Sequence, residues 1–218
     1  MSQIQLDKLN KEIISCRQCL RLVEWREEVA RVKRKAYKDE EYWGKPVPGF
    51  GDPNARVLVV GLAPGAHGSN RTGRQFTGDA SGGFLFPALH RAGFANQAEA
   101  ESRGDGLLLK DMYITASGRC APPDNKPTLE ELKNCQPFLV RELEIIKPKV
   151  IVCLGQIAFD RVARIYSARL KFSHGGTFQL PNGMYVIGSY HPSQQNTLTG
   201  KLTVEMFDQI WKKVKSLL

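Results

Sequence analysis

Residues 57–79 read VLVVGLAPGAHGSNRTGRQFTGD, an apolar run followed at once by a long glycine-rich segment. Four consecutive apolar residues, three of them valines, are typical of a strand that is buried on both faces. The segment from Gly61 to Asp79 contains five glycines, which lack a side chain and let the backbone approach a ligand closely. The stretch therefore predicts a buried strand that ends in a functional loop.

Further strands and helices are expected on both sides of this stretch. Apolar, β-branched runs predict strands at residues 113–115, 150–154 and 185–187. Periodic apolar patterns predict helices over the first 37 residues and at residues 83–92, 128–146, 156–166 and 202–218, the third of which opens with the capping-box pair Thr128 and Glu131. Strands that alternate with helices predict a mostly parallel, covered sheet with its site in the loops after the strands.

Length, composition and charge limit the class of protein. A chain of 218 residues with 42% hydrophobic content suits one domain, expected over residues 1–218. The sequence has no long apolar span and no secretory signal at its start, so we expect a cytoplasmic protein without a membrane partner. The net charge of +9 predicts a polyanionic partner, naturally nucleic acid, although an ordinary basic enzyme fits this charge as well.

The loop after the first strand does not match a nucleotide-cofactor motif. A phosphate-binding P-loop needs Gly-Lys-Ser/Thr, and a dinucleotide fold needs the G-x-G-x-x-G spacing. Neither occurs within GLAPGAHGSNRTGRQFTGD. The sequence therefore disfavours a nucleotide cofactor at this loop.

Four of the five cysteines form a candidate metal set. Cys16 and Cys19 lie in a C-x-x-C pattern near the start of the chain, Cys120 follows the second strand, and Cys135 lies in a predicted helix. Disulfides are not expected in a reducing cytosol, and on spacing alone four thiolates suit zinc or an iron–sulfur cluster equally. Cys153 lies in the apolar run VIVCL, where we expect an ordinary core residue.

Three blocks, GLAPGAHGSNRTGRQFTGD (61–79), ASGRCAPPDNKP (116–127) and HPSQQNTLTG (191–200), together resemble the type-5 branch of the uracil-DNA glycosylase superfamily. The resemblance runs from Cys16 to the final helix. It implies a three-layer α/β/α fold with a central, mostly parallel four-stranded sheet. It also implies a monofunctional DNA-repair glycosylase that hydrolyses the N-glycosidic bond of uracil in DNA, and of hypoxanthine and xanthine, leaving an abasic site.

The resemblance further implies a cofactor. In this family the matching cysteines hold a four-iron four-sulfur (4Fe-4S) cluster, here on Cys16, Cys19, Cys120 and Cys135, with zinc as the less favoured alternative. We expect the cluster to be structural, tying an N-terminal helical arm to the loop after Cys120, because hydrolysis of a glycosidic bond needs no electron transfer.

Three catalytic residues are implied in the same way. His191 matches a histidine that donates a hydrogen bond to O2 of the departing base, Asp79 matches a carboxylate proposed to hold the water, and Asn125 matches an asparagine that contacts the base. Each has an ordinary structural alternative: His191 as a turn cap, Asp79 as a helix N-cap and Asn125 as a turn residue.

Gly61, Ala63 and Phe76 complete the implied substrate pocket, where the ring of Phe76 would stack on the extruded base unless it is simply core. Ala63 stands at or next to the position where other branches carry an Asp or Asn, which puts a simple general-base mechanism in doubt. His67 lies in the same loop and is expected at most to line the pocket.

The implied partner is double-stranded DNA, and also single-stranded DNA, bound by a monomer. The basic run at residues 33–38 is either a solvated helix face or a DNA contact. Further candidates for phosphate contacts are Arg71, Arg74, Lys126 and Lys201, and candidates for filling the gap left by a flipped base are Gln194, Gln195 and Leu198. Two rivals stay open: a noncatalytic, metal-stapled nucleic-acid-binding protein, and a glycosylase of another branch that acts on uracil alone.

Overall fold

The centre of the molecule is a parallel sheet. The structure, a computed structural model, describes residues 2–218, so Met1 of the predicted domain lies outside it. The sheet has the order β1-β3-β2-β4-β6-β5. Its four central strands run parallel: β2 (Val57–Gly61), β3 (Met112–Ala116), β4 (Val150–Leu154) and β6 (Tyr185–Ser189). The predicted four-stranded parallel sheet is confirmed.

Two short strands extend this sheet beyond the prediction. β1 (Phe50–Gly51) pairs antiparallel with β3, and β5 (Thr177–Gln179) pairs antiparallel with β6. With two and three residues, they are too short to produce a periodic pattern in the sequence. They form the edges of a six-stranded mixed sheet.

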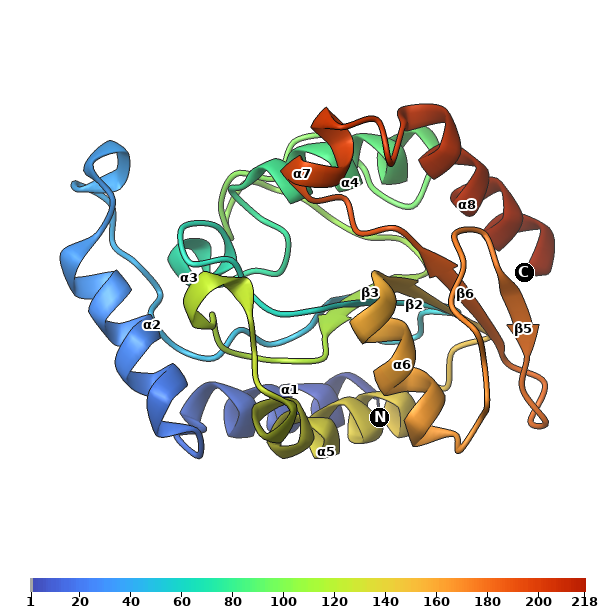
Figure 1. Ribbon diagram of the computed structural model, residues 1–218, viewed down its shortest axis with the longest axis horizontal. Coiled ribbons are helices and arrows are strands. Elements are labelled where there is room, and N and C mark those ends of the chain that lie inside the picture. The colour runs from blue at the N-terminus through green and yellow to red at the C-terminus, as the bar shows by residue number, and fades with distance from the viewer. Residues whose placement is uncertain (1) are drawn as a thin grey trace.

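Helices cover both faces of the sheet, which gives three layers (Figure 1). On one face lie α4 (Ala80–Arg91) and α8 (Val204–Leu217), and on the other lie α1 (Ser2–Ser15), α5 (Leu129–Ile146) and α6 (Gln156–Ile165). Successive side chains of a strand point to opposite faces. In β2, accordingly, Val57 and Val59 pack with α4 and α8, whereas Leu58 and Val60 pack with α5 and α6.

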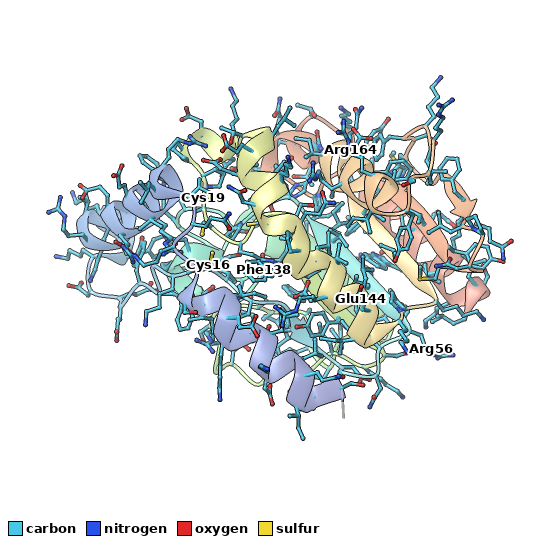
Figure 2. The ribbon with its side chains drawn as sticks, turned by 90° about the horizontal axis from the view of Figure 1, so that it is seen from below. Cys16, Cys19, Arg56, Phe138, Glu144 and Arg164 are labelled. Atoms are coloured by element: carbon cyan, nitrogen blue, oxygen red, sulfur yellow. The ribbon has the colours of Figure 1, made fainter. Side chains whose placement is uncertain are left out.

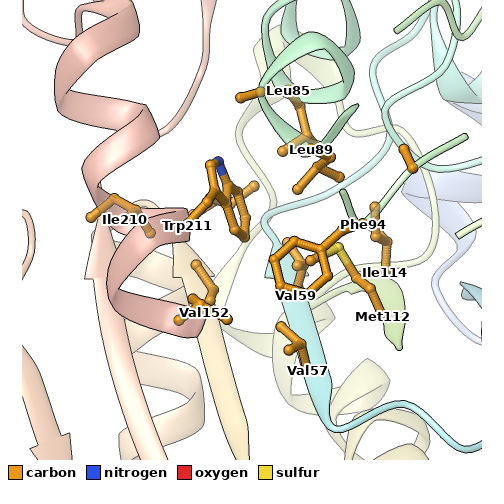
Figure 3. Close-up of a cluster of buried hydrophobic side chains, with 14 of the residues drawn as sticks. Val57, Val59, Leu85, Leu89, Phe94, Met112, Ile114, Val152, Ile210 and Trp211 are labelled. Atoms are coloured by element: carbon orange, nitrogen blue, oxygen red, sulfur yellow. The ribbon is translucent and has the colours of Figure 1, made fainter. Parts of the chain in front are cut away.

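The α4–α8 side of the core is built around Trp211. Its ring lies between the sheet and α4, near Val152 on one side and Leu89 on the other (Figure 3). Trp211 is 1% exposed and makes edge contacts with Phe94 and Phe207. This core fixes α4 and α8 relative to the strands whose carboxyl ends carry the candidate site.

The N-terminal helical region is two helices rather than one. α1 ends at Ser15, and α2 (Leu20–Val32) begins after Cys19, which has extended backbone angles. The prediction of helix over the first 37 residues is thus correct except at the C-x-x-C turn and after Val32, where η1 (Lys35–Tyr37) is a short 3-10 helix. α2 stands at one end of the molecule, beside the loop after β2 (Figure 1).

Three short helices shape the loops after the strands. They are α3 (Ser69–Thr72), η2 (Pro123–Asn125) and α7 (Gln194–Leu198), each in one of the three blocks singled out above. No helix within residues 2–218 has the length and apolar character needed to cross a lipid bilayer.

Candidate active site

The loops after β2, β3 and β6 meet around one cavity of about 810 Å³. Parallel strands bring their carboxyl ends to the same edge of the sheet, so loops distant in sequence converge there. The cavity lining includes all six residues of the predicted catalytic and substrate-binding set: Gly61, Ala63, Phe76, Asp79, Asn125 and His191. The predicted convergence is therefore confirmed.

Phe76 forms an aromatic wall of the cavity beside His191. The two ring centroids are 5.9 Å apart, with 31° between the planes. Phe76 has a φ of 53°, which is unusual for a residue with a side chain, and close packing maintains it. A Cβ at Gly61 would lie 2.7 Å from the Phe76 ring, so the glycine provides room for the ring. Phe76 belongs both to the core and to the cavity.

His191 is half-buried and its ring is not used to hold the fold. Its backbone carbonyl accepts a hydrogen bond of 2.9 Å from Asn196 Nδ2, but within residues 2–218 neither ring nitrogen is hydrogen-bonded. Ser193, not His191, caps α7, so the turn-cap alternative is wrong. Burial lowers the pKa of His191 to about 4. A neutral imidazole therefore lines the cavity at neutral pH.

The two carboxylate oxygens of Asp79 have different surroundings. Its Oδ1 accepts hydrogen bonds from the backbone N–H groups of Ser81 at 3.0 Å and Gly82 at 3.1 Å, which makes it the N-cap of α4. Oδ2 faces Gly68, where a Cβ would lie only 2.0 Å away. Burial raises the pKa of Asp79, against the opposing effect of the two backbone hydrogen bonds. The N-cap alternative is correct, yet the second oxygen is left facing the glycine loop.

Asn125 lies on the exposed rim of the cavity. It is the last residue of η2, has a φ of 55° and bonds through its backbone N–H to the carbonyl of Pro122 at 3.3 Å. No hydrogen bond to residues 2–218 engages its side-chain amide, which can both donate and accept. Ala63 contributes only its small side chain, so no carboxylate stands at that position.

Arg34, Tyr37 and His67 also line the cavity, although the residue pattern gave them little or no role. His67 Nδ1 lies 3.1 Å from the hydroxyl oxygen of Tyr42, a buried residue outside the loop. The N-terminal part of the chain thus completes a cavity that the sequence placed in the loops alone. The basic run at residues 33–38 was the only signal in the sequence for this contribution.

Two predicted phosphate contacts are wrong. Arg71 is 8% exposed, pairs with Glu40 and donates to the carbonyls of His67 at 2.8 Å and Gly78 at 2.9 Å. Arg74 is 7% exposed and makes a bidentate pair with Asp105 at 2.8 and 2.6 Å. Both guanidinium groups are used within the protein to hold the glycine-rich loop.

The other predicted DNA contacts are exposed. Lys126 and Lys201 lie at the surface, as does Leu198, whose side chain is 78% exposed. Gln194 and Gln195 line the cavity, whereas Leu198 stands beyond it at the end of α7.

The four predicted metal ligands lie where α1, α2 and α5 meet. Figure 2 shows Cys16 and Cys19 at the turn between α1 and α2, close to α5. Cys120 and Cys135 are buried, and burial raises the pKa of both thiols. Neighbouring cysteines raise these pKa values further, so the four thiols are near enough to interact electrostatically. Among residues 2–218, however, no three Cys, His, Asp or Glu side chains are arranged to hold a metal ion.

A buried guanidinium group adjoins these cysteines. Arg26 is 1% exposed and donates to Cys120 Sγ at 3.2 Å and to the carbonyl of Cys16 at 3.4 Å. Its nearest carboxylate oxygen, on Glu27, is 3.7 Å away, and its Nε has no hydrogen-bond partner within the described chain. Cys153 is 0% exposed in β4, as predicted for a core residue.

Comparisons with known proteins identify the family of this chain. The family model described as "Uracil DNA glycosylase superfamily" matches residues 48–215. A "Type-5 uracil-DNA glycosylase" of Thermus thermophilus is 52% identical over 94% of each chain, and one of Mycobacterium leprae is 51% identical over 97% of this chain and 95% of its own. A "Type-4 uracil-DNA glycosylase" of Archaeoglobus fulgidus is 32% identical over 86% of this chain and 81% of its own.

Proposed function

This chain belongs to the uracil-DNA glycosylase superfamily, and on that premise we propose that it is a type-5 enzyme that excises uracil from DNA. It hydrolyses the N-glycosidic bond and leaves an abasic site. The observation that carries the proposal is the position of the His191 imidazole beside the Phe76 ring, in the cavity where the loops after β2 and β6 converge.

The reaction begins with extrusion of the base from the duplex. Extrusion costs a few kcal/mol and is easiest for a mispaired base such as uracil opposite guanine. The Phe76 ring stacks on the extruded base, and the unengaged amide of Asn125 reads its pairing edge. Together, the two side chains hold the nucleotide with its glycosidic bond near His191.

Bond cleavage then separates charge. The electron pair of the glycosidic bond leaves with the base, so negative charge develops on the base and positive charge on the sugar ring. His191 donates a hydrogen bond from a ring N–H to O2 of the base, which stabilises the departing anion. Because this imidazole is neutral and already placed, no proton has to be taken up first.

Water completes the hydrolysis. Its oxygen bonds to C1′ of the sugar and its proton is lost to solvent. Asp79 holds that water with Oδ2, since Oδ1 is committed to capping α4. Ala63 offers no carboxylate for general-base catalysis, so stabilisation of the leaving base supplies most of the reduction in the barrier.

The proposed substrates include the deaminated purines hypoxanthine and xanthine. Ligand cavities in proteins range from about 300 to about 1,000 Å³. A cavity of about 810 Å³ has room for a base larger than uracil. We propose that the open cavity and the small Ala63 side chain together allow these larger bases to bind.

The cofactor in this proposal is a 4Fe-4S cluster held by Cys16, Cys19, Cys120 and Cys135, with a structural role. A single zinc ion would need thiolates about 2.3 Å from one centre, an arrangement that is not found among the described residues. A cluster of several irons spaces its thiolates more widely, and its negative charge would add to the long ion pair of 3.7 Å that buried Arg26 makes with the exposed Glu27.

DNA is the proposed partner, in double-stranded and single-stranded form. The net charge of +9 favours its phosphates, and the exposed Lys126 and Lys201 remain candidate contacts. We further propose a monomer that works in the cytoplasm, as one domain with the cluster-bearing arm formed by α1 and α2.

One assay tests the proposed function. Duplexes and single strands carrying uracil, hypoxanthine or xanthine are incubated with the protein, and abasic sites are then cleaved with alkali. Strand breaks at all three bases are the expected result. Breaks at uracil alone would favour a narrower glycosylase, and no breaks on any substrate would leave a noncatalytic nucleic-acid-binding protein.

A further inference from the structure

Tyr42 and His67 form a hydrogen-bonded pair at the edge of the cavity. The Tyr42 hydroxyl is 3.1 Å from His67 Nδ1, and the rings meet edge to face with centroids 6.1 Å apart. Tyr42 is 8% exposed and His67 is half-buried, so the pair has little room to rearrange. The geometry fixes the orientation of the His67 ring.

The position of the hydroxyl proton determines the tautomer of His67. The backbone N–H of Arg34 points at the Tyr42 hydroxyl from 3.4 Å, and an N–H can only donate. In the proposed arrangement the phenol accepts from Arg34 and donates its own proton to His67 Nδ1. The ring hydrogen of a neutral His67 must then be on Nε2. Burial and the charges of Arg34 and Arg71 lower the pKa of His67, which keeps it neutral.

The Nε2 edge of the His67 ring lies away from the Tyr42 contact, and the residue belongs to the cavity lining. Within residues 2–218 Nε2 has no hydrogen-bond partner, and His67 and Arg34 line the same cavity. Arg34 is exposed and forms no ion pair in the described chain, whereas Arg71 is already paired with Glu40. One free guanidinium group and one free N–H donor therefore stand at the mouth of the cavity, and both suit an anionic oxygen.

We propose that His67 Nε2 and Arg34 bind a phosphate of the DNA strand next to the extruded nucleotide, with Tyr42 as the positioning residue that fixes the His67 tautomer. This inference rests on the proposed function. His191, Asn125 and Phe76 already supply the proposed contacts to the base. The positive charge of Arg34 at the rim therefore suits a phosphate of the DNA backbone better than a neutral carbonyl group of the base.

The test measures binding to DNA that carries a neutral linkage. Duplexes contain a 2′-fluoro deoxyuridine, which resists cleavage, flanked on its 5′ or its 3′ side by an uncharged methylphosphonate. Wild type is compared with His67→Asn, which removes the donor, with His67→Gln, whose amide can replace Nε2, and with Tyr42→Phe and Arg34→Ala. Arg164→Ala removes an exposed guanidinium from α6, away from the cavity, and serves as the matched control.

We expect His67→Asn to weaken binding of ordinary DNA about tenfold, as does the loss of a hydrogen bond to a charged group, with partial recovery in His67→Gln. At one of the two methylphosphonate positions, the affinity of the wild type should also fall about tenfold. At that position the affinity of His67→Asn and Arg34→Ala should fall almost no further than it does on ordinary DNA. Arg34→Ala should also reduce the slope of log affinity against log salt by about 1.

The phosphate site would be overturned if His67→Asn lost as much affinity at both methylphosphonate positions as the wild type does, in addition to the loss caused by the substitution itself. An effect of His67→Asn on the rate of excision that differs among uracil, hypoxanthine and xanthine would overturn it too, by placing Nε2 on the base. Tyr42→Phe binding as tightly as wild type would overturn the role of Tyr42. Failure of the wild type to excise uracil would instead reject the proposed function, because these binding measurements need no cleavage.

Discussion

At the residue scale, His191 is the side chain on which the proposed chemistry depends most. His191→Ala removes the donor to the departing base and should slow excision of uracil about a hundredfold or more, as the loss of one preorganised donor does elsewhere. DNA affinity should barely change, because phosphates supply most of it. Single-turnover excision and equilibrium binding measure the two effects. His90→Ala, at an exposed position of α4 outside the cavity, is the control, and near-normal excision by His191→Ala would reject the assignment.

The pH dependence of excision follows from the same residue. With a pKa of about 4 instead of 6.5, His191 stays neutral until the solution is strongly acidic. The single-turnover rate should therefore show no inflection near pH 6.5 that depends on His191. It should fall only as acid protonates His191 and Asp79, whose pKa is raised. An inflection near pH 6.5 that disappears in His191→Gln would show instead that the imidazole titrates normally.

The lowered pKa of His191 should also make the folded protein less stable in acid. Between about pH 6.5 and 4 the unfolded chain binds a proton at His191 and the folded chain does not. The free energy of unfolding should therefore fall as the pH falls through this range, and less steeply in His191→Gln. Urea denaturation at several pH values measures this. Equal slopes for wild type and His191→Gln would contradict it.

Strand patterns located the loops of the cavity, and the family resemblance located the residues within them, but neither located their polar partners. His191, Asp79 and Phe76 follow strands whose carboxyl ends must meet in a parallel sheet, so their convergence was predictable. The pairing of Arg74 with Asp105 was not, because it joins residues 31 apart across a loop without periodicity. An arginine in a glycine-rich loop has the same sequence signature whether it binds DNA or an internal carboxylate.

At the scale of elements, the start of α5 connects several parts of the molecule. The Thr128 hydroxyl accepts from the backbone N–H of Glu131, whose carboxylate accepts from the N–H of Thr128 and from Arg21 of α2. Thr128→Ala removes a cap and should lower the free energy of unfolding by about 1 kcal/mol. Urea denaturation measures it against Ser102→Ala, whose exposed hydroxyl is unbonded within the described chain. An equal effect of the two changes would show that the cap is not used.

The elements that sequence analysis found are those with enough residues to establish a period. The buried strands β2 and β4 have five residues each, and α5 has eighteen with a capping box. β1 and β5 form because a neighbouring strand offers a free edge for pairing. The residues of these two short strands do not themselves indicate that such an edge is present. The break between α1 and α2 falls at Cys16 and Cys19, the pair proposed to bind the cluster.

At the scale of the whole molecule, the proposed cluster would connect the N-terminal arm to the domain. Two of the proposed ligands lie between α1 and α2, one follows β3 and one lies in α5. The two cores on either side of the sheet contain none of the four. A cluster on these cysteines should therefore stabilise the arm strongly and the sheet weakly.

Loss of the cluster should accordingly loosen α2 and leave the sheet folded. In Cys19→Ser, bound iron and visible absorption should disappear, amide hydrogens of α2 should exchange far faster, and those of β2 and β4 should stay protected. Because Arg34, which lines the cavity, lies two residues after the end of α2, DNA binding should weaken as well. Cys153→Ala, which removes a core thiol in β4, is the matched control and should keep its iron.

Full iron content in Cys19→Ser would contradict the ligand set. If the amides of α2 stayed protected without iron, direct contacts such as that of Arg21 with Glu131 would be what holds the arm in place.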